Sequence, residues 1–390
     1  MSFSISRLLK KHSSKLAIAA SALLLAASAG AIVGGLNLLL GQVYEASDFY
    51  GNGATNVVIN SDSVSTNCPS GVGPHGPSTP CIINQNRARA TLVTATSINY
   101  DSLSGSFMAG DTVLVIQMTG SGAGSWEFSE VATDSGTSMT LVASKALRKT
   151  YLANATQVIK VDEFNNVTIN SGGFLTSPAW NGTTGGVFAM QVAGTLTMDD
   201  GSSNPTTWPT QKVPSHISMG YVNVAGFMGG VGTFAARGFR GNNVVAGGEA
   251  AYAGASGQSI SPGSHEYLIM GGGSINHSSA SAGGGVVIVK ARATAFSGRI
   301  SVAGAAAPGN TGAVSGVAYL SSANIDLSDA TCGAFNLSGG TGATSGPMGR
   351  GFVNYGRDPA AGDGSISAAC SNVATLFGGA SGTIRRYHLK

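Results

Sequence analysis

Apolar and polar residues alternate over short stretches of this chain, most regularly in residues 283–304. Two apolar runs, 286–293 and 299–303, are separated by a break at Ser297 and Gly298, and glycines flank both runs. A strand has a period of two, so alternate residues share a face. One face then holds the apolar Val287, Val289, Ala291, Ile300 and Val302, and the other holds the basic Lys290, Arg292 and Arg299. This pattern predicts two short consecutive strands.

Similar units recur in residues 185–201, which have the same glycine pair, apolar run and second short strand, and in residues 324–340. A strand, a glycine turn and another strand, repeated about every 20 residues, are typical of a stack in which each unit pairs with its neighbours. We therefore expect a mostly β fold, a β-helix or solenoid-like stack with glycine-rich excursions, preceded by an N-terminal hydrophobic helix. The alternative is a β-sandwich over residues 91–198 followed by a separate glycine-rich domain.

Further short strands, rich in Val, Thr, Ile and Phe, are predicted between Gly, Asp, Asn and Ser residues. They are residues 56–60, 91–98, 112–118, 126–131, 139–143, 158–161, 167–169, 174–176, 187–192 and 383–387. No long amphipathic helix is predicted after Leu40, which argues against an α/β architecture. We divide the chain into a leader (1–41), a linker or cap module with a disulfide loop (42–90), a strand-rich core (91–198), a glycine-rich excursion (199–282) and a strand-rich C-terminal part (283–390).

The leader has the pattern of an export signal. Basic residues from Arg7 to Lys15 precede an apolar run, 16–27, and the small residues Ala27, Ser28 and Ala29 form a cleavage pattern. The apolar residues 31–40 lengthen the run to about 25 residues, enough to span a bilayer. The segment is therefore interpreted either as a cleaved signal peptide or as a membrane anchor, and the rest of the chain is predicted to be extracellular or at the cell surface.

Composition agrees with a structured, weakly charged protein. Charged residues make up 10% of the chain, the net charge is +3, and 58 residues are glycine. Disorder normally accompanies low hydrophobicity and high net charge, and this chain has neither. The basic residues are scattered, so no nucleic-acid partner is predicted.

Four cysteines in an exported chain predict two disulfides. Spacing favours Cys68 with Cys81 and Cys332 with Cys370, although three connectivities are open. A metal site at Cys68, His75 and Cys81 is the alternative for the first pair, but the intervening segment is rich in turn residues.

Several segments resemble a module of bacterial glycine-rich surface proteins, described as gliding-motility or adhesin-like. The resemblance covers roughly residues 91–389. It rests on residues 110–118, the Trp126-Glu127-Phe128 run, residues 166–170 and 179–186, the GxRG-like element 237–241, and the closing residues 382–387. It implies an exported, repetitive structural or adhesive protein and brings no catalytic residues.

The sequence contains few patterns that are typical of a catalytic or cofactor site. Residues 71–76 satisfy G-x-G-x-x-G but contain Pro74 and open no helix, so no dinucleotide site is predicted. A β-helix that cleaves carbohydrate would need converging carboxylates. The candidates are Asp162 with Glu163, Asp199 with Asp200, and Glu249 with Glu266, all interpreted first as solvated turn residues. We predict no enzyme activity, no metal and no cofactor.

The residues of this chain favour a binding surface over an active site. Aromatic residues could stack on sugars, and two arginines could hold acidic glycans. The candidates are Trp126, Trp180, Trp208, Tyr252, Arg237 and Arg240. We expect a structural or adhesive protein that self-associates or contacts cell-envelope glycans, with membrane contact only through the leader; the alternative is a carbohydrate-binding or carbohydrate-cleaving β-helix.

Overall fold

The computed structural model describes residues 50–199 apart from 77, 120 and 121, and then residues 216–218, 268, 283–304, 307–311, 315–326, 335–339, 342–344, 349–355 and 382–388. The leader, Cys332 and Cys370 lie outside these residues, as does most of the glycine-rich excursion. From Gly51 onward, the regular elements of the described part are strands and one 3-10 turn. The prediction of a mostly β protein is therefore confirmed.

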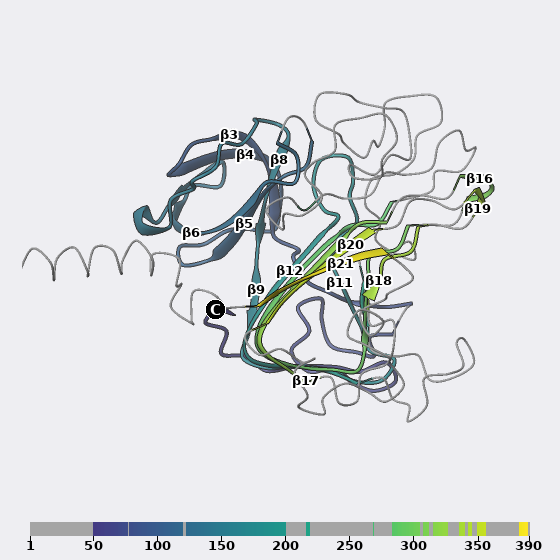
Figure 1. Ribbon diagram of the computed structural model, residues 1–390. Coiled ribbons are helices and arrows are strands. Elements are labelled where there is room, and N and C mark those ends of the chain that lie inside the picture. The colour runs from purple at the N-terminus through teal and green to yellow at the C-terminus, as the bar shows by residue number, and fades with distance from the viewer. Residues whose placement is uncertain are drawn as a thin grey trace, which may run out of the picture. The chain divides into compact units, whose positions relative to one another are not determined.

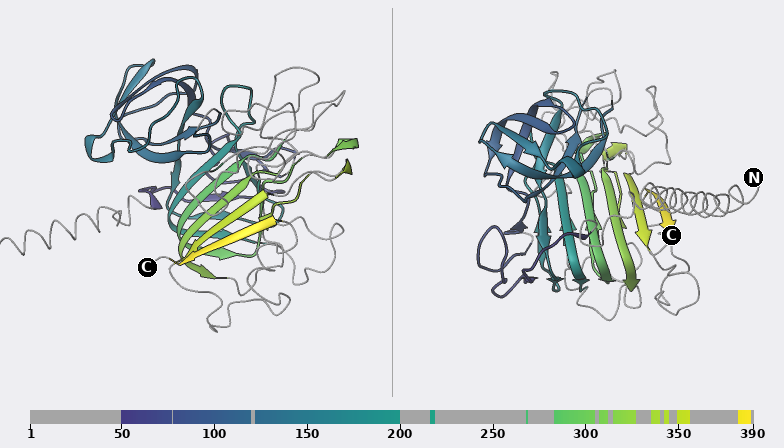
Figure 2. Two further views of the ribbon diagram at one scale, coloured as in Figure 1. Left: turned by 45° about the horizontal axis from the view of Figure 1, so that its top comes forward. Right: turned by 90° about the vertical axis from the view of Figure 1, so that its left-hand side faces the viewer.

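Eight described strands form a parallel sheet, called here the large sheet, in the order β1, β10, β12, β14, β17, β20 and β21, with β9 also paired to β12. Figure 2 shows the strands from β10 to β21 side by side, coloured from teal to yellow. Their bounds are β1 (Val57–Ile59), β9 (Asp162–Phe164), β10 (Val167–Ile169), β12 (Val187–Met198), β14 (Val286–Phe296), β17 (Val317–Asp326), β20 (Gly349–Tyr355) and β21 (Gly382–His388).

A second parallel sheet, the small sheet, has its described strands in the order β2, β11, β13, β15 and β18; Figure 1 labels β11 and β18 of this sheet. These are β2 (Cys81–Ile82), β11 (Phe174–Thr176), β13 (His216–Ser218), β15 (Arg299–Ser301) and β18 (Phe335–Asn336). Strands of the two sheets alternate along the chain: β10 continues into β11, β12 precedes β13, and β14 continues into β15. A further parallel pair joins β16 (Ala307–Thr311) to β19 (Gly342–Thr344).

One apolar core lies between the two sheets. It contains the five residues that alternation places on one face of 283–304, all with essentially no exposed surface: Val287, Val289, Ala291, Ile300 and Val302. That prediction is confirmed. The two similar units of the sequence also lie side by side, since β12 pairs with β14 in parallel from Val187 opposite Val286 to Met198 opposite Phe296, with one bulge.

Glycine allows a close crossing where the strands of the large sheet begin. A Cβ atom at Gly316 would overlap the carbonyl oxygen of Gly285, and one at Gly349 would overlap the carbonyl oxygen of Gly316. The Val302 carbonyl accepts the Gly316 N–H at 2.8 Å and the Ser315 hydroxyl at 2.7 Å. The glycines that precede β17 and β20 are therefore required by backbone approach.

Between β2 and β9 the chain forms a closed antiparallel barrel with the strand order β3, β4, β7, β6, β5 and β8. Sequence reasoning did not anticipate this barrel, which occupies much of the predicted 91–198 core. Its elements are β3 (Arg87–Val93), β4 (Ser97–Ser104), β5 (Thr112–Gln117), β6 (Trp126–Asp134), β7 (Ser138–Leu141), the 3-10 turn η1 (Ala143–Lys145) and β8 (Thr156–Lys160). The predicted single strand 91–98 is wrong, because Thr94 and Ser97 close a tight turn between β3 and β4.

Strand β5 is buried on both faces, which explains its unbroken apolar run. Val113 and Val115 lie in the barrel interior, whereas Leu114 and Ile116 belong to a second core. That second core also contains Ala189, Ile288, Val317 and other residues of the large sheet. The barrel therefore covers the part of the large sheet's outer face where β12, β14 and β17 begin, whereas Arg292, further along β14, is exposed.

The disulfide between Cys68 and Cys81 is present, as predicted. Because both thiols are used, the alternative metal site with His75 is wrong. The segment that leads into the disulfide loop contacts the edge strand β1, where Val58 and Thr66 exchange two backbone hydrogen bonds of 3.1 and 2.8 Å. In the part of the chain that the structure describes, no helix is long and apolar enough to cross a membrane.

Candidate functional site

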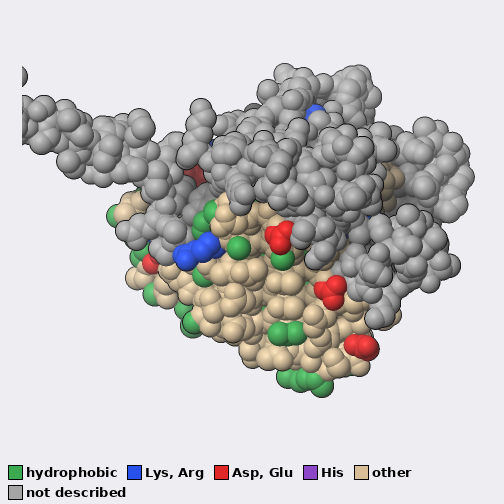
Figure 3. Space-filling view, turned by 60° about the horizontal axis from the view of Figure 1, so that its bottom comes forward, with side chains coloured by type: hydrophobic (Ala, Val, Ile, Leu, Met, Phe, Trp, Pro, Cys, Tyr) green, Lys and Arg blue, Asp and Glu red, His purple; other side chains and the backbone are tan. Residues whose placement is uncertain are grey.

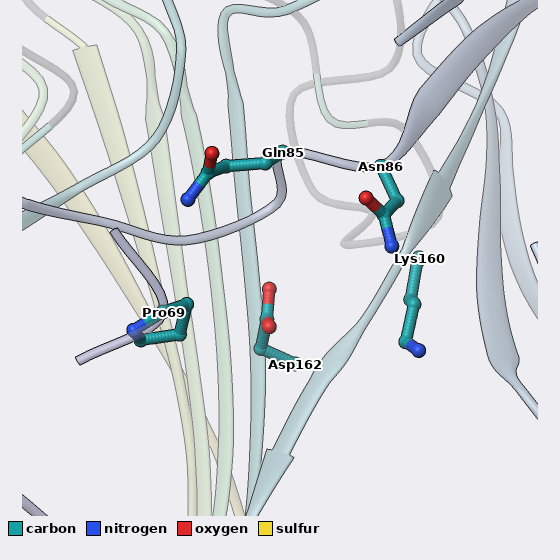
Figure 4. Close-up of a pocket in the computed structure, with 5 residues that line it drawn as sticks. All are labelled: Pro69, Gln85, Asn86, Lys160 and Asp162. Carbon is teal, nitrogen blue, oxygen red and sulfur yellow. The ribbon is translucent and has the colours of Figure 1, made fainter. Parts of the chain in front are cut away.

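A polar pocket lies where the chain passes between the parallel sheets and the barrel. The chain enters the barrel through residues 83–86, leaves it at the end of β8, and begins β9 two residues later. A cavity of about 230 Å³ at this point is lined by Pro69 of the disulfide loop and by Gln85, Asn86, Lys160 and Asp162 (Figure 4). Three separate stretches of sequence therefore meet at one pocket.

Asn84 fixes the backbone beside this pocket. It is buried and adopts a positive φ of 54°, a conformation that Asn tolerates better than most residues. Its side chain accepts the N–H of Ala189 and donates to the carbonyl of the same residue, both at 2.8 Å, and it also donates to the Lys160 carbonyl at 3.1 Å. This side chain thereby supplies the hydrogen bonds that a neighbouring strand would give to the edge of β12.

Asp162 directs its carboxylate towards the segment that carries Asn84, Gln85 and Asn86 (Figure 4). Its Oδ2 atom accepts the Asn84 N–H at 2.6 Å and the Asn84 side-chain amide at 3.1 Å. Burial raises the pKa of Asp162 to about 6, and the Asn84 hydrogen bond and Lys160 only partly oppose this effect. A carboxyl group with a raised pKa in a pocket is a functional-site candidate.

The remaining polar groups of the pocket are arranged around Asp162. Lys160 forms an ion pair with Asp111 at 2.6 Å, and its side chain is about one-quarter exposed. The Oδ1 atom of Asn86 lies against Gly105, where a Cβ atom would overlap it. Within the described part of the chain, the Asn86 carboxamide and the Oδ1 atom of Asp162 have no hydrogen-bond partner. The pocket therefore offers an unused donor group and an unused acceptor.

Asp162 and Glu163, paired as candidate carboxylates in the sequence, do not converge. They are adjacent in β9, so their side chains point to opposite faces. Glu163 instead lies beside Gln191 and Gly51, since a Cβ at Gly51 would contact both side chains. Burial raises the pKa of Glu163. Asp199 follows β12 and donates its N–H to the Ile169 carbonyl, while Asp200, Glu249 and Glu266 lie outside the described residues.

The predicted aromatic platform is only partly described. Trp180 is 9% exposed and Trp126 is half-buried, and both pack in or against the core between the barrel and the large sheet. Trp126 makes edge contacts with Phe128 and Tyr319 at centroid distances of 5.5 and 5.4 Å. The other candidates, Trp208, Tyr252, Arg237 and Arg240, lie outside the described residues.

Lys290 is a buried cation that sequence reasoning placed on the outer strand face without recognising its burial. It is 5% exposed, and its ammonium nitrogen lies 4.2 Å from the Phe128 ring centroid and 5.9 Å from that of Trp126. Burial lowers its pKa to about 7. The nearest sequence signal was its place in an alternating run, which does not show that the barrel covers that face.

No group of three or more His, Cys, Asp and Glu residues in the described ranges is placed to hold a metal ion. Comparisons of the chain with protein-family models, with curated proteins and with solved structures found no match.

Proposed function

We propose that this chain is an exported, non-enzymatic structural or adhesive cell-surface protein whose parallel sheets are successive coils of a β-solenoid. The supporting observation is the strand order of the two sheets. The series β1, β10, β12, β14 and β17 in the large sheet is matched by β2, β11, β13, β15 and β18 in the small sheet. A chain that winds repeatedly through both sheets produces this order, with each coil paired to the one before it.

Two features support export. The leader has the charge and apolar pattern of a secretion signal. The Cys68–Cys81 disulfide is of the kind that persists in oxidising compartments. Together they favour a protein that works outside the cytoplasm, either released or held by its leader.

The two ends of the large sheet differ. At β1, Thr66, which precedes the disulfide loop, pairs with Val58, so this edge is partly capped. At the other end, β21 is the last strand, and no described strand pairs with its outer edge. An edge strand can pair with another chain. Figure 3 shows only scattered charged side chains on the coloured part of the face in view, and charged residues make up 10% of the whole chain, so charge repulsion would be weak. These features support self-association as the form that a structural role takes.

Two experiments test the proposal. Protease treatment of intact source cells is expected to digest the chain, whereas a cytoplasmic protein would be spared; protection of the folded chain in intact cells together with release only on lysis would overturn the proposed location. Electron microscopy of concentrated protein is expected to show extended assemblies. Discrete monomers across a range of salt and pH would overturn the self-association.

The enzymatic alternative has a separate test. A β-helix that cleaves carbohydrate needs two carboxyl groups, or a carboxylate with calcium, across the scissile bond. The described pocket is lined by one carboxylate, Asp162. Assays on a polysaccharide panel, with and without calcium, are expected to show no turnover. Turnover that Asp162→Asn abolishes would replace the structural proposal with an enzymatic one.

A further inference from the structure

We propose that the pocket between Asn86 and Asp162 binds a single uncharged sugar residue. This inference makes the adhesive part of the proposed function more specific. It rests on the proposed function only where it names a cell-envelope glycan as the source of the sugar. The size of the cavity, the hydrogen-bonding groups that line it and the net charge of the lining support this ligand.

Size limits the ligand. The cavity measures about 230 Å³, below the range of roughly 300–1,000 Å³ that is common for drug-sized ligands. A long oligosaccharide or a nucleotide would not be enclosed. A monosaccharide, or one terminal residue of a glycan, is a better match for a pocket of this size.

The available polar groups match hydroxyl groups. A sugar hydroxyl both donates and accepts hydrogen bonds. The Oδ1 atom of Asp162 is an unused acceptor, because the Asn84 bonds both go to Oδ2. The Asn86 carboxamide has an unused amide group, and the Lys160 ammonium, which makes one ion pair with Asp111, keeps further N–H donors. Neighbouring hydroxyls on one ring could therefore donate to Asp162 and accept from Asn86.

Charge favours a neutral ligand. Lys160 is neutralised by Asp111 at 2.6 Å, which leaves Asp162 as the uncompensated charge of the lining. An anionic sugar would place its carboxylate near that of Asp162, and like charges at short range repel. Uronic acids are thus expected to bind more weakly than neutral hexosides.

The rigidity of the surroundings suits binding. Asn84 holds the backbone beside the pocket through hydrogen bonds to Ala189, Lys160 and Asp162. Gly105 leaves space for the Asn86 carboxamide, since any side chain at that position would overlap its Oδ1 atom. Groups that are held in place before the ligand arrives lose less freedom on binding.

The test is saturation-transfer NMR on the full chain with methyl glycosides of glucose, galactose, mannose and N-acetylglucosamine as probes, and with methyl glucuronoside as the anionic probe. At least one neutral glycoside is expected to bind. Asn86→Ala is expected to weaken binding about tenfold, because it removes one hydrogen-bonding group from a preorganised site. The matched control is Asn99→Ala, which removes an exposed carboxamide from the barrel strand β4 and is expected to change nothing.

Three results would overturn the inference: no binding by any neutral probe, binding that Asn86→Ala leaves unchanged in a folded variant, or tighter binding of the glucuronoside. A circular dichroism spectrum of each variant checks its folding. Asp162→Gly, which removes the acceptor altogether, is expected to weaken binding as Asn86→Ala does, so the conclusion does not depend on one variant. If the chain is exposed on the cell surface but binds no glycoside, this inference is wrong and the proposed function is unaffected.

Discussion

The side chain of Asn84 hydrogen-bonds both the N–H and the carbonyl of Ala189, each at 2.8 Å, and so joins the entrance of the barrel to the edge of β12. These two residues are far apart in the sequence and lie in different structural parts. Ala189 lies in β12 one residue before the pairing with β9 begins, so without Asn84 its two buried backbone groups would lack these partners, which would be costly. Asn84 therefore acts as a one-residue substitute for a neighbouring strand.

Asn84→Gly is predicted to lower the free energy of unfolding by about 2–4 kcal/mol, because it leaves the Ala189 backbone groups unsatisfied. Glycine tolerates the positive φ of 54°, so the loss reports the hydrogen bonds and not backbone strain. Denaturant unfolding measures the change. Asn67→Gly is the control, since Asn67 has a φ of 57° but is exposed, and it is expected to cost less than about 1 kcal/mol. Equal losses in the two variants would contradict the role of Asn84.

Lys290→Met is predicted to stabilise the protein near pH 6. The pKa of Lys290 is lowered to about 7 from 10.5 by burial, so between these two pH values the unfolded chain binds more protons than the folded chain. Wild-type stability therefore rises as the pH increases from about 7 to about 10.5, and the destabilising effect is largest below pH 7. The Phe128 and Trp126 rings offset part of it, which leaves an expected gain on the order of 1–3 kcal/mol for the variant.

Unfolding of wild type and Lys290→Met at several pH values between 6 and 10 measures this effect. The difference between them should shrink as the pH rises. Arg292→Met is a matched control on the same strand, because Arg292 is exposed, and its effect should not change with pH over this range. A Lys290→Met variant less stable than wild type at pH 6 would show that the charged lysine is stabilising where it lies.

Asp162→Asn is predicted to remove a decrease of stability with rising pH, which is opposite in direction to the effect of Lys290. Because burial raises the folded-state pKa of Asp162 from 3.8 to about 6, the folded chain holds this proton more tightly. The protonated Asp162 carboxyl therefore contributes roughly 1–3 kcal/mol to the free energy of unfolding. This stabilisation is fully present below about pH 3.8 and is lost as the pH rises to about 6. The variant should show a flatter stability profile between pH 4 and 6. An unchanged slope in that interval would show that Asp162 does not titrate there.

Gly316→Ala is predicted to cost about 3–5 kcal/mol or to prevent folding, because its Cβ would overlap the Gly285 carbonyl oxygen and push apart two paired strands. The matched control is Gly136→Ala. Gly136 has a positive φ of 86° but open space around it, so alanine there should cost only about 1–2 kcal/mol. Thermal unfolding compares the two variants, and a Gly316→Ala variant as stable as Gly136→Ala would show that the strands can separate at no cost.

The sequence by itself determined the local features of the parallel sheets. The alternation in residues 283–304 placed Val287 and Val289 on the core face, and short apolar runs bounded by glycine marked strands such as β11. The recurrence of one unit in residues 185–201 indicated a stack, and β12 and β14 do pair. Cysteine spacing gave the Cys68–Cys81 bond. These features could be predicted because a strand's period, a glycine turn and a short disulfide loop depend on residues close together in the chain.

Only the tertiary structure decided the barrel, the pocket and the burial of Lys290. The barrel closes through pairing of β3 with β8, and its strands look like any other alternating runs in the sequence. Lys290 is buried because Phe128 comes to lie over it, and the pKa of Asp162 is raised because β8, β9 and the segment after β2 converge. Such contacts join residues distant in the chain, and the free energy that selects them comes from burial of surfaces that no local pattern identifies.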